Sequence, residues 1–203
     1  MFYKALAKQI GIDLDRFNIS VLMADGIGFK PYVSLLRSLN IPFVLRTDND
    51  VFRVAHQNVY RFAGVQRAVE IYKTFCEKDP IIESLVTDDH RLQGFATVPP
   101  PDEIAEYAGK LARALERAGI FISEVDLEHD LHSALPDVTA NYFGIDREED
   151  VIAEMQKRKA TFMFDFLQQH SDALVRINRH PLASPLFLCQ QIAEAQYGID
   201  ANP

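Results

Sequence analysis

Cysteine is scarce in this chain, which has only Cys76 and Cys189 among its 203 residues. The two lie far apart and lack the close spacing of metal-binding cysteine pairs, so they indicate buried thiols of a reduced, cytosolic protein. No apolar run reaches the roughly 18 residues that suggest a membrane-spanning helix. The N-terminal stretch is too short and polar to resemble a signal peptide. The sequence therefore predicts a cytoplasmic protein without a membrane segment.

Positive charge is also in short supply, with 21 Lys and Arg against 29 Asp and Glu, for a net charge of −8. A protein that held nucleic acid by counterion release alone would be basic. Any nucleic-acid role must therefore depend on a local basic strip or on bound metal ions. The sequence has no Walker loop, no Gly-x-Ser-x-Gly elbow and no Cys/His nucleophile arrangement.

Helical and strand patterns alternate along the first 50 residues. The spacing of apolar residues predicts a helix over 2–10, a buried strand over 18–24, a second helix ending at Asn40, and a strand over 41–47. This order predicts a parallel sheet with right-handed crossovers. Because no cap residue precedes the first helix, we expect the chain to be a fragment of a larger protein. The apolar side of the second helix carries Tyr32, Val33, Leu35, Leu36 and Leu39. In the rest of the chain we expect a strand over 120–123 and helices over 58–76, 102–118, 147–169 and about 184–196.

Acidic residues follow two of the predicted strands. Asp48 and Asp50 come directly after strand 41–47, and Asp126 and Glu128 follow strand 120–123. Ligands of parallel α/β sheets bind outside the carboxyl ends of the strands. Four carboxylates gathered there would suit two Mg²⁺ or Mn²⁺ ions that clamp a phosphodiester. The alternatives are a solvated turn at Asp48 and Asp50, and a helix cap with an acidic first turn at Asp126 and Glu128.

Two other motifs have a structural and a functional interpretation. Gly26 and Gly28 follow the strand expected over 18–24, with Lys30 opening the next helix. They allow close approach to a phosphate, or they serve a tight turn. The basic triplet Lys157-Arg158-Lys159 is either a solvated helix face or a source of a lysine that stabilises charge in a transition state.

Together these motifs resemble a known family. Ile19 to Asp50 resembles the Toprim domain of the overcoming-lysogenisation-defect (OLD) family of ATP-dependent nucleases. The resemblance rests on Asp25-Gly26-Ile27-Gly28-Phe29-Lys30, on the leucine-rich helix, and on Leu39-Asn40-Ile41-Pro42 leading to Thr47-Asp48-Asn49-Asp50. The stretch Asp126-Leu127-Glu128-His129-Asp130-Leu131 and the lysine at 159 look like the family's C-terminal half.

The resemblance implies an α/β, Toprim-like (Rossmann-like) fold, a mostly parallel sheet flanked by helices. Residues 1–55 and 102–145 would form the catalytic core. Residues 56–101 would be a helical insertion closed by the stiff connector Pro99-Pro100-Pro101. Residues 146–203 would be a helical C-terminal part.

The resemblance also implies a metal-dependent DNA endonuclease with a two-metal mechanism. Asp48, Asp50, Asp126 and Glu128 would bind two Mg²⁺ or Mn²⁺ ions, and Asp48, Asp50 and Lys159 would be catalytic. The implied partners are DNA and an N-terminal ABC-type ATPase domain of the parent protein, through which a homo-oligomer would form. The strand ending in Glu-Gly that opens a Toprim domain is not found in the sequence, so we expect an incomplete metal site. Residues expected to contact DNA phosphates are Gly26, Gly28, Lys30 and Lys157, and Lys157 is the fallback for the catalytic lysine.

Two other functions remain open. Asp48-Asn49-Asp50-Val51 also fits haloacid-dehalogenase-like phosphatases, in which the first aspartate is phosphorylated and the second is the acid and base. That motif usually lies on the first strand, whereas here a strand and a helix are expected before it. The third interpretation is a non-catalytic DNA-docking domain.

Overall fold

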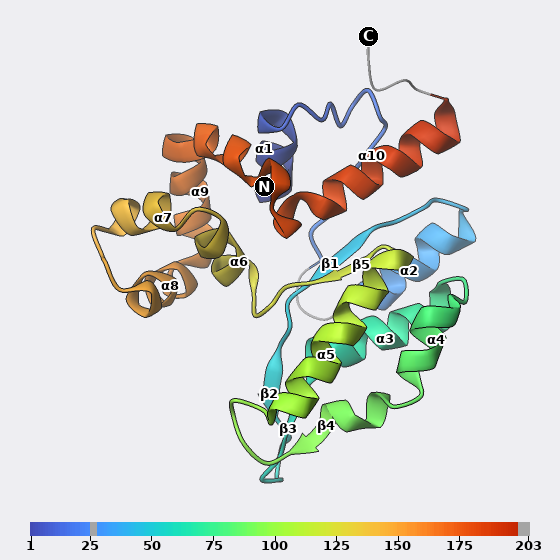
Figure 1. The fold of residues 1–203 in the computed structure, drawn as a ribbon. Helices are drawn as coiled ribbons and strands as arrows, with labels where there is room; N and C mark the ends of the chain where they lie inside the picture. Colours follow the sequence, from blue (N-terminus) through green and yellow to red (C-terminus); the bar gives the residue numbers. More distant parts are fainter. Residues whose placement is uncertain (25–27, 199–203) are drawn as a thin grey trace. The chain divides into compact units, whose positions relative to one another are not determined.

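The structure, a computed structural model, describes residues 1–24 and 28–198 (Figure 1). It is mostly helical, with one small parallel and one small antiparallel sheet. The chain divides into two compact units. We call Asp25–Asp126 the sheet unit, and Met1–Ala24 together with Leu127–Pro203 the helical unit.

The sheet unit contains the five strands found in residues 1–24 and 28–198. The strands β1 (Leu45–Thr47) and β5 (Ile120–Ile122) pair in parallel, with Leu45 opposite Ile120 and Thr47 opposite Ile122. An antiparallel sheet has the order β2-β3-β4. Its strands are β2 (Val51–Arg53), β3 (Tyr60–Phe62) and β4 (Gln93–Phe95). The helices of the unit are α2 (Phe29–Ser38), α3 (Ala63–Phe75), α4 (Pro80–Val86) and α5 (Asp102–Leu115). Short 3₁₀ turns lie at Asp89–Leu92 and Glu116–Ala118.

The core of the sheet unit lies where α3 and α5 pack on β5. The apolar faces of the two helices supply fully buried side chains such as Val65, Tyr72 and Leu111, which meet Ile120. Helix α5 starts with two acidic residues, which the helix dipole favours. Its 3₁₀ extension ends at Gly119, whose φ of 74° is a left-handed conformation that suits glycine. This ending turns the chain directly into β5.

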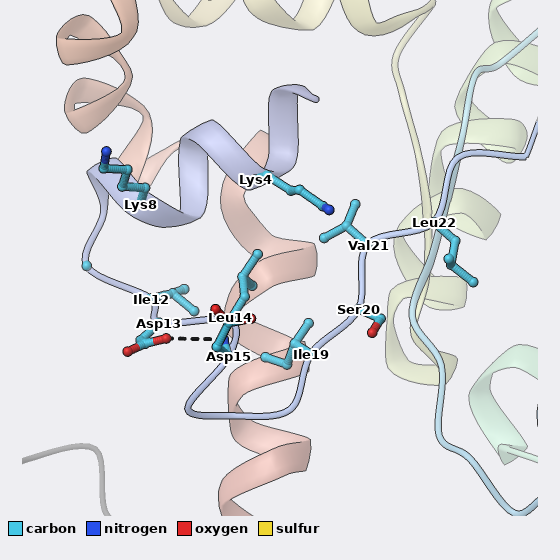
Figure 2. Close-up of a pocket in the computed structure, with 11 residues that line it drawn as sticks. Lys4, Lys8, Ile12, Asp13, Leu14, Asp15, Ile19, Ser20, Val21 and Leu22 are labelled. Carbon is cyan, nitrogen blue, oxygen red and sulfur yellow. Dashed lines mark hydrogen bonds between the residues drawn. The ribbon is translucent and has the colours of Figure 1, made fainter.

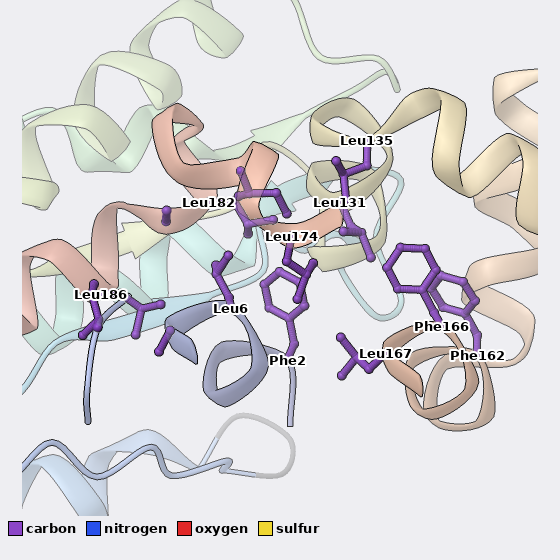
Figure 3. Packing of buried hydrophobic residues seen from close by; sticks show 14 of the residues in the cluster. Phe2, Leu6, Leu131, Leu135, Phe162, Phe166, Leu167, Leu174, Leu182 and Leu186 are labelled. Atoms are coloured by element: carbon purple, nitrogen blue, oxygen red, sulfur yellow. The ribbon is translucent and has the colours of Figure 1, made fainter. Parts of the chain in front are cut away.

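The helical unit is built around a second apolar core, part of which Figure 3 shows. Phe2 and Leu6 of α1 lie in this core with Leu131, Phe162 and Phe166. The unit consists of α1 (Phe2–Gln9), α6 (Leu127–Ala134), α7 (Pro136–Phe143), α8 (Glu148–Lys157), α9 (Lys159–His170), two 3₁₀ segments over Ser171–Arg179 and Pro181–Ala183, and α10 (Ser184–Tyr197).

The strands expected over 41–47 and 120–123 are present as β1 and β5, which pair in parallel, but three other expectations about strands are wrong. The sheet is not mostly parallel, because the three strands β2, β3 and β4 are antiparallel. Residues 18–24 form no strand; Leu22 and Met23 are 69% and 83% exposed, and no strand pairs with them. The segment 56–101 is not purely helical, because it also contains β3 and β4.

Helix predictions were more accurate than strand predictions, with two corrections. The helix expected over 147–169 is two helices that meet at Arg158. The helix ending at Asn40 exists as α2, but of its apolar side Val33 alone is buried, whereas Tyr32 and Leu35 are more than half exposed. Helical spacing thus identified the helix without showing what covers it. The division of the chain into domains stays a prediction. It assigns a catalytic core to 1–55 and 102–145, an insertion to 56–101 and a C-terminal part to 146–203.

Within residues 1–24 and 28–198, no helix combines the length and apolar character needed to cross a bilayer. The two thiols, Cys76 and Cys189, are both free.

Cys189 on α10 offers a test of the packing of the helical unit. Burial raises the pKa of its thiol from 9.0 to about 11. Because the thiolate is the reactive form, its fraction near pH 8 is on the order of 100-fold below that of an ordinary thiol. We expect iodoacetamide to modify Cys189 more slowly by about this factor in the folded protein than in guanidinium. Equal rates in the two conditions, measured by mass spectrometry of the Cys189 peptide, would contradict the packing of α10.

Candidate functional site

The paired strands β1 and β5 continue into two loops that are hydrogen-bonded to each other. Beyond the strands, the Ser123 amide donates to the Thr47 carbonyl at 3.0 Å. The Asn49 amide donates to the Val125 carbonyl at 2.8 Å, and the Asn49 side chain donates to the Glu124 carbonyl at 3.2 Å. Loops 48–50 and 124–126 therefore lie side by side at the carboxyl ends of parallel strands. This is the position at which α/β proteins bind ligands.

The loop 48–50, which we call the acid loop, is fixed from its other side by the first turn of α3. The amide of Ala63 donates to the Asp50 carbonyl at 2.7 Å. A Cβ atom on Gly64 would lie 2.1 Å from the Asp48 carbonyl oxygen and 2.7 Å from the Asn49 Cα. No real Cβ contact is that short, so the helix reaches the acid loop only because residue 64 is glycine.

Arg67, one turn further along α3, binds the side chains of the same region. Its guanidinium donates to Thr47 Oγ1 at 2.7 Å and to Asp50 Oδ2 at 2.8 Å, and it lies 6.0 Å from the centre of the Phe29 ring. The Arg67 side chain is largely buried. The negative charge of Asp50 is therefore balanced by a cation of the protein itself.

The other predicted metal ligands, Asp126 and Glu128, are both buried. Asp126 is the last residue of the sheet unit, and Glu128 is in the first turn of α6 in the helical unit. Buried carboxylates are uncommon unless they are paired or bind a cation. Their positions also fit the alternative interpretation, because Asp126 directly precedes α6 and Glu128 lies in its acidic first turn.

Glu128 has a cationic partner in the predicted catalytic lysine. Lys159 Nζ lies 3.1 Å from Glu128 Oε2; the Glu128 side chain is 6% exposed and the Lys159 side chain 54%. The lysine opens α9, directly after the break at Arg158. The buried carboxylate holds an ammonium group that is still open to solvent, so Lys159 can meet an anionic ligand. Lys157 instead ends α8 and pairs with Glu154 at 3.2 Å.

The predicted phosphate-binding residues are less organised. Gly26 lies outside the described residues. Gly28 caps the N-terminus of α2, and Lys30 in the first turn forms an exposed ion pair with Glu70 of α3. A phosphate role for Gly26, Gly28, Lys30 and Lys157 stays a prediction.

The carboxylates suit a hard divalent cation by chemistry, because Mg²⁺ prefers oxygen ligands. Too few of them lie together to form a metal site, since residues 1–24 and 28–198 contain no group of three His, Cys, Asp or Glu side chains placed to hold a metal ion. The structure thus brings Asp48, Asp50 and Asp126 into neighbouring loops without forming a complete metal site.

A pocket lies in the helical unit, and none of the predicted site residues lines it (Figure 2). It has a volume of about 720 Å³ and is bordered by Lys4 and Lys8 of α1 and by segment 11–22. Its charged groups have mixed sign, because Asp13 and Asp15 face the same space as the two lysines. The pocket therefore indicates no particular ligand.

Sequence analysis missed Gly64 and Arg67, the two residues that hold the acid loop. Both belong to the segment 58–76, for which the sequence predicts a continuous helix and no contact with the acid loop. One available signal was the absence of Asp and Glu from 51–69, a segment with three arginines that directly follows two aspartates.

Comparison with known proteins supports the resemblance stated above. Residues 1–50 match the family described as "Overcoming lysogenization defect protein-like, TOPRIM domain". The chain is 25% identical over 157 residues to Endonuclease GajA of Bacillus cereus (strain VD045), a match covering 74% of this chain and 26% of that protein. The chain thus spans about a quarter of the length of this relative. The resemblance to the OLD family is confirmed for the Toprim region.

Two solved structures are also similar to the chain. The C-terminal region of the Xanthomonas campestris pv. campestris OLD protein is 18% identical, with a TM-score of 0.47, over 97% of this chain and 89% of that one. The C-terminal region of the Burkholderia pseudomallei OLD protein is 16% identical, with a TM-score of 0.49, over 94% and 91% of the two chains.

Proposed function

We propose that this chain, whose residues 1–50 carry an OLD-like Toprim domain, is the nuclease module of a larger ATPase-nuclease and hydrolyses DNA phosphodiester bonds with divalent metal ions. The observation that carries the proposal is the parallel pairing of β1 and β5, which brings Asp48, Asp50 and Asp126 to the ligand-binding end of the strands. The relative named as an endonuclease supports a nuclease over other hydrolases.

In this proposal Asp48, Asp50, Asp126 and Glu128 are the acids that bind two Mg²⁺ or Mn²⁺ ions. Such ions, when bound, supply an activated water and neutralise charge on the phosphodiester. The chain itself supplies Lys159, whose half-exposed ammonium is held by the buried Glu128 and would stabilise negative charge developing on the scissile phosphate. Asp48 and Asp50 are proposed to be catalytic together with Lys159.

Gly64 and Arg67 act through the acid loop and are positioning residues. They hold the backbone and side chains of residues 47–50 without being assigned a part in the chemistry. This division predicts different consequences for substitutions at positions 64 and 48, because the first would move the loop and the second would remove a ligand.

The proposal includes partners that lie outside the chain. We propose DNA as the substrate, an ABC-type ATPase domain in the parent protein, and a homo-oligomer formed through that parent. A cytoplasmic location fits the two free thiols.

Titration of the metal-free protein with Mn²⁺ in a calorimeter tests the metal site without measuring cleavage. We expect binding that weakens at least about 10-fold in Asp48→Asn, since loss of a metal-site residue commonly has effects of this size. Asp102→Asn is the matched control, because Asp102 is an exposed acid in the first turn of α5. Absence of Mn²⁺ binding, or equal binding by Asp48→Asn, would contradict the metal-dependent mechanism and favour a DNA-docking domain. A phosphorylated Asp48 trapped from a phosphate-ester substrate would instead support the phosphatase.

A further inference from the structure

The segment 51–69 has a charge opposite to that of the chain. It contains Arg53, Arg61, Arg67 and His56 but no Asp or Glu, in a protein with a net charge of −8. Arg67 is turned inward, where it binds Asp50. The other two arginines belong to the antiparallel sheet β2-β3-β4, and both are exposed. The acidic chain therefore has a local basic surface on this sheet.

The register of the sheet places an aromatic ring beside one of these arginines. Phe52 of β2 lies opposite Arg61 of β3, which lies opposite Gln93 of β4. Directly opposed residues share a face of a sheet, and all three are exposed, Phe52 by 51%. The other face packs inward, with the rings of Phe62 and Phe95 buried 5.2 Å apart. We call the face with Phe52, Arg61 and Gln93 the outer face.

The positive charge of Arg61 is not neutralised within the part of the chain that the structure describes. The Arg61 side chain forms no ion pair or hydrogen bond with any residue of 1–24 and 28–198. Arg53 is next to Phe52 along β2 and therefore points to the opposite face, where it bonds the Gln57 carbonyl at 3.3 Å and the Asn58 side chain at the β2–β3 turn. An arginine side chain without a partner among the described residues, opposite an exposed ring on the outer face, suits an anionic, aromatic ligand.

We propose that the outer face of β2-β3-β4 binds a single strand of DNA with unpaired bases. Phe52 stacks with one base, and Arg61, which lies opposite Phe52 on the same face, contacts a flanking phosphate, which is the way that sequence-tolerant single-strand sites combine aromatic and cationic groups. A duplex has no free base face to offer Phe52, whereas an unpaired strand does. The inference rests on the proposed function. Because β2 starts at Val51, directly after Asp50, a DNA strand bound to this face would lead to the acid loop.

Fluorescence anisotropy with a labelled oligothymidine of about 12 nucleotides, in EDTA, tests the surface without cleavage. We expect Phe52→Ala to weaken binding by about 5- to 100-fold and Phe52→Trp to preserve it, because stacking needs only an aromatic face. Arg61→Gln should weaken binding and reduce the slope of log affinity against log salt by about 0.7, the loss of one phosphate contact. Phe164→Ala (a Phe that is 46% exposed, on α9) and Arg147→Gln (an exposed Arg at the start of α8) are the matched controls.

The surface is refuted if Phe52→Ala binds like the unmodified chain, or if Arg61→Gln leaves the salt slope unchanged. Displacement by unlabelled duplex as efficient as by unlabelled single strand would overturn the stacking role of Phe52. Self-association that is lost in Phe52→Ala, without DNA binding, would assign the outer face to a contact between copies. Binding that persists in EDTA while the chain fails to cleave DNA would refute the proposed nuclease and leave the surface standing.

Discussion

Replacing Gly64 with alanine is expected to reduce DNA cleavage at least about 100-fold, although the variant retains every predicted catalytic side chain. The added Cβ would lie 2.1 Å from the Asp48 carbonyl oxygen, and the neighbouring atoms are backbone atoms of residues 48–50, which cannot rotate away. Either α3 or the acid loop must move. Displacement of reacting groups by about 1 Å costs on the order of 100-fold in rate. The overpacking also lowers the free energy of unfolding by about 1–3 kcal/mol.

The matched control is Gly109→Ala on α5. A Cβ at position 109 would meet only Arg113 Nη1, at the ordinary distance of 3.5 Å. Since alanine stabilises a helix interior relative to glycine by about 0.8–1 kcal/mol, this variant should be as stable as the unmodified chain or more so, with unchanged cleavage. Plasmid-nicking rates and urea unfolding of both variants check the prediction. Full activity in Gly64→Ala would show that the acid loop is not part of the reaction site.

Phe166→Ala is expected to destabilise the helical unit by about 3–5 kcal/mol, the range for removing a fully buried aromatic ring. Phe166 has no exposed surface. Its ring packs against Phe162 at 5.3 Å, His170 at 5.5 Å and Tyr142 at 6.0 Å between ring centres. These contacts fix α9, the helix that Lys159 opens, so the substitution should also lower cleavage.

Phe164→Ala removes the same side chain from the same helix, at a position that is 46% exposed. We expect a change within about 0.5 kcal/mol, as for other surface substitutions. The comparison, made by urea unfolding followed by far-UV circular dichroism, therefore separates burial from helix propensity. Similar losses in the two variants would contradict the orientation of α9.

The two strands that pair at the centre of the sheet unit were predictable from the sequence because their signals are local. Ile41 to Thr47 and Ile120 to Ser123 are short apolar stretches followed by polar residues. Helices between them, which have clear spacing, leave few ways to connect strands other than right-handed crossovers. The positions of Asp48, Asp50 and Asp126 at the ends of these strands followed from the same reasoning.

Other features depend on contacts that no local pattern contains. Residues 18–24 are apolar enough for a strand, but a strand requires a partner, and the chain enters this segment at Asn18 with a positive φ of 53°. Tyr60 to Phe62 lies in the stretch 58–76, whose apolar spacing is helical, yet these residues form β3 and pair with β2 and β4. Arg67 reaches Asp50 across 17 positions, and the composition of 51–69 does not show which of its three arginines forms that pair.

Nicking of supercoiled plasmid in Mg²⁺, Mn²⁺ or EDTA tests the central claim most directly, with the unmodified chain, Asp48→Ala, Lys159→Ala and the surface control Lys110→Ala. Lys110 forms only an exposed ion pair with Glu106, which contributes little. Because the metal site is incomplete among the described residues, we expect slow nicking by the unmodified chain and Lys110→Ala with either metal, none in EDTA, and none by Asp48→Ala or Lys159→Ala. Nicking in EDTA, nicking that survives both substitutions, or no metal-dependent nicking by the unmodified chain would contradict the central claim.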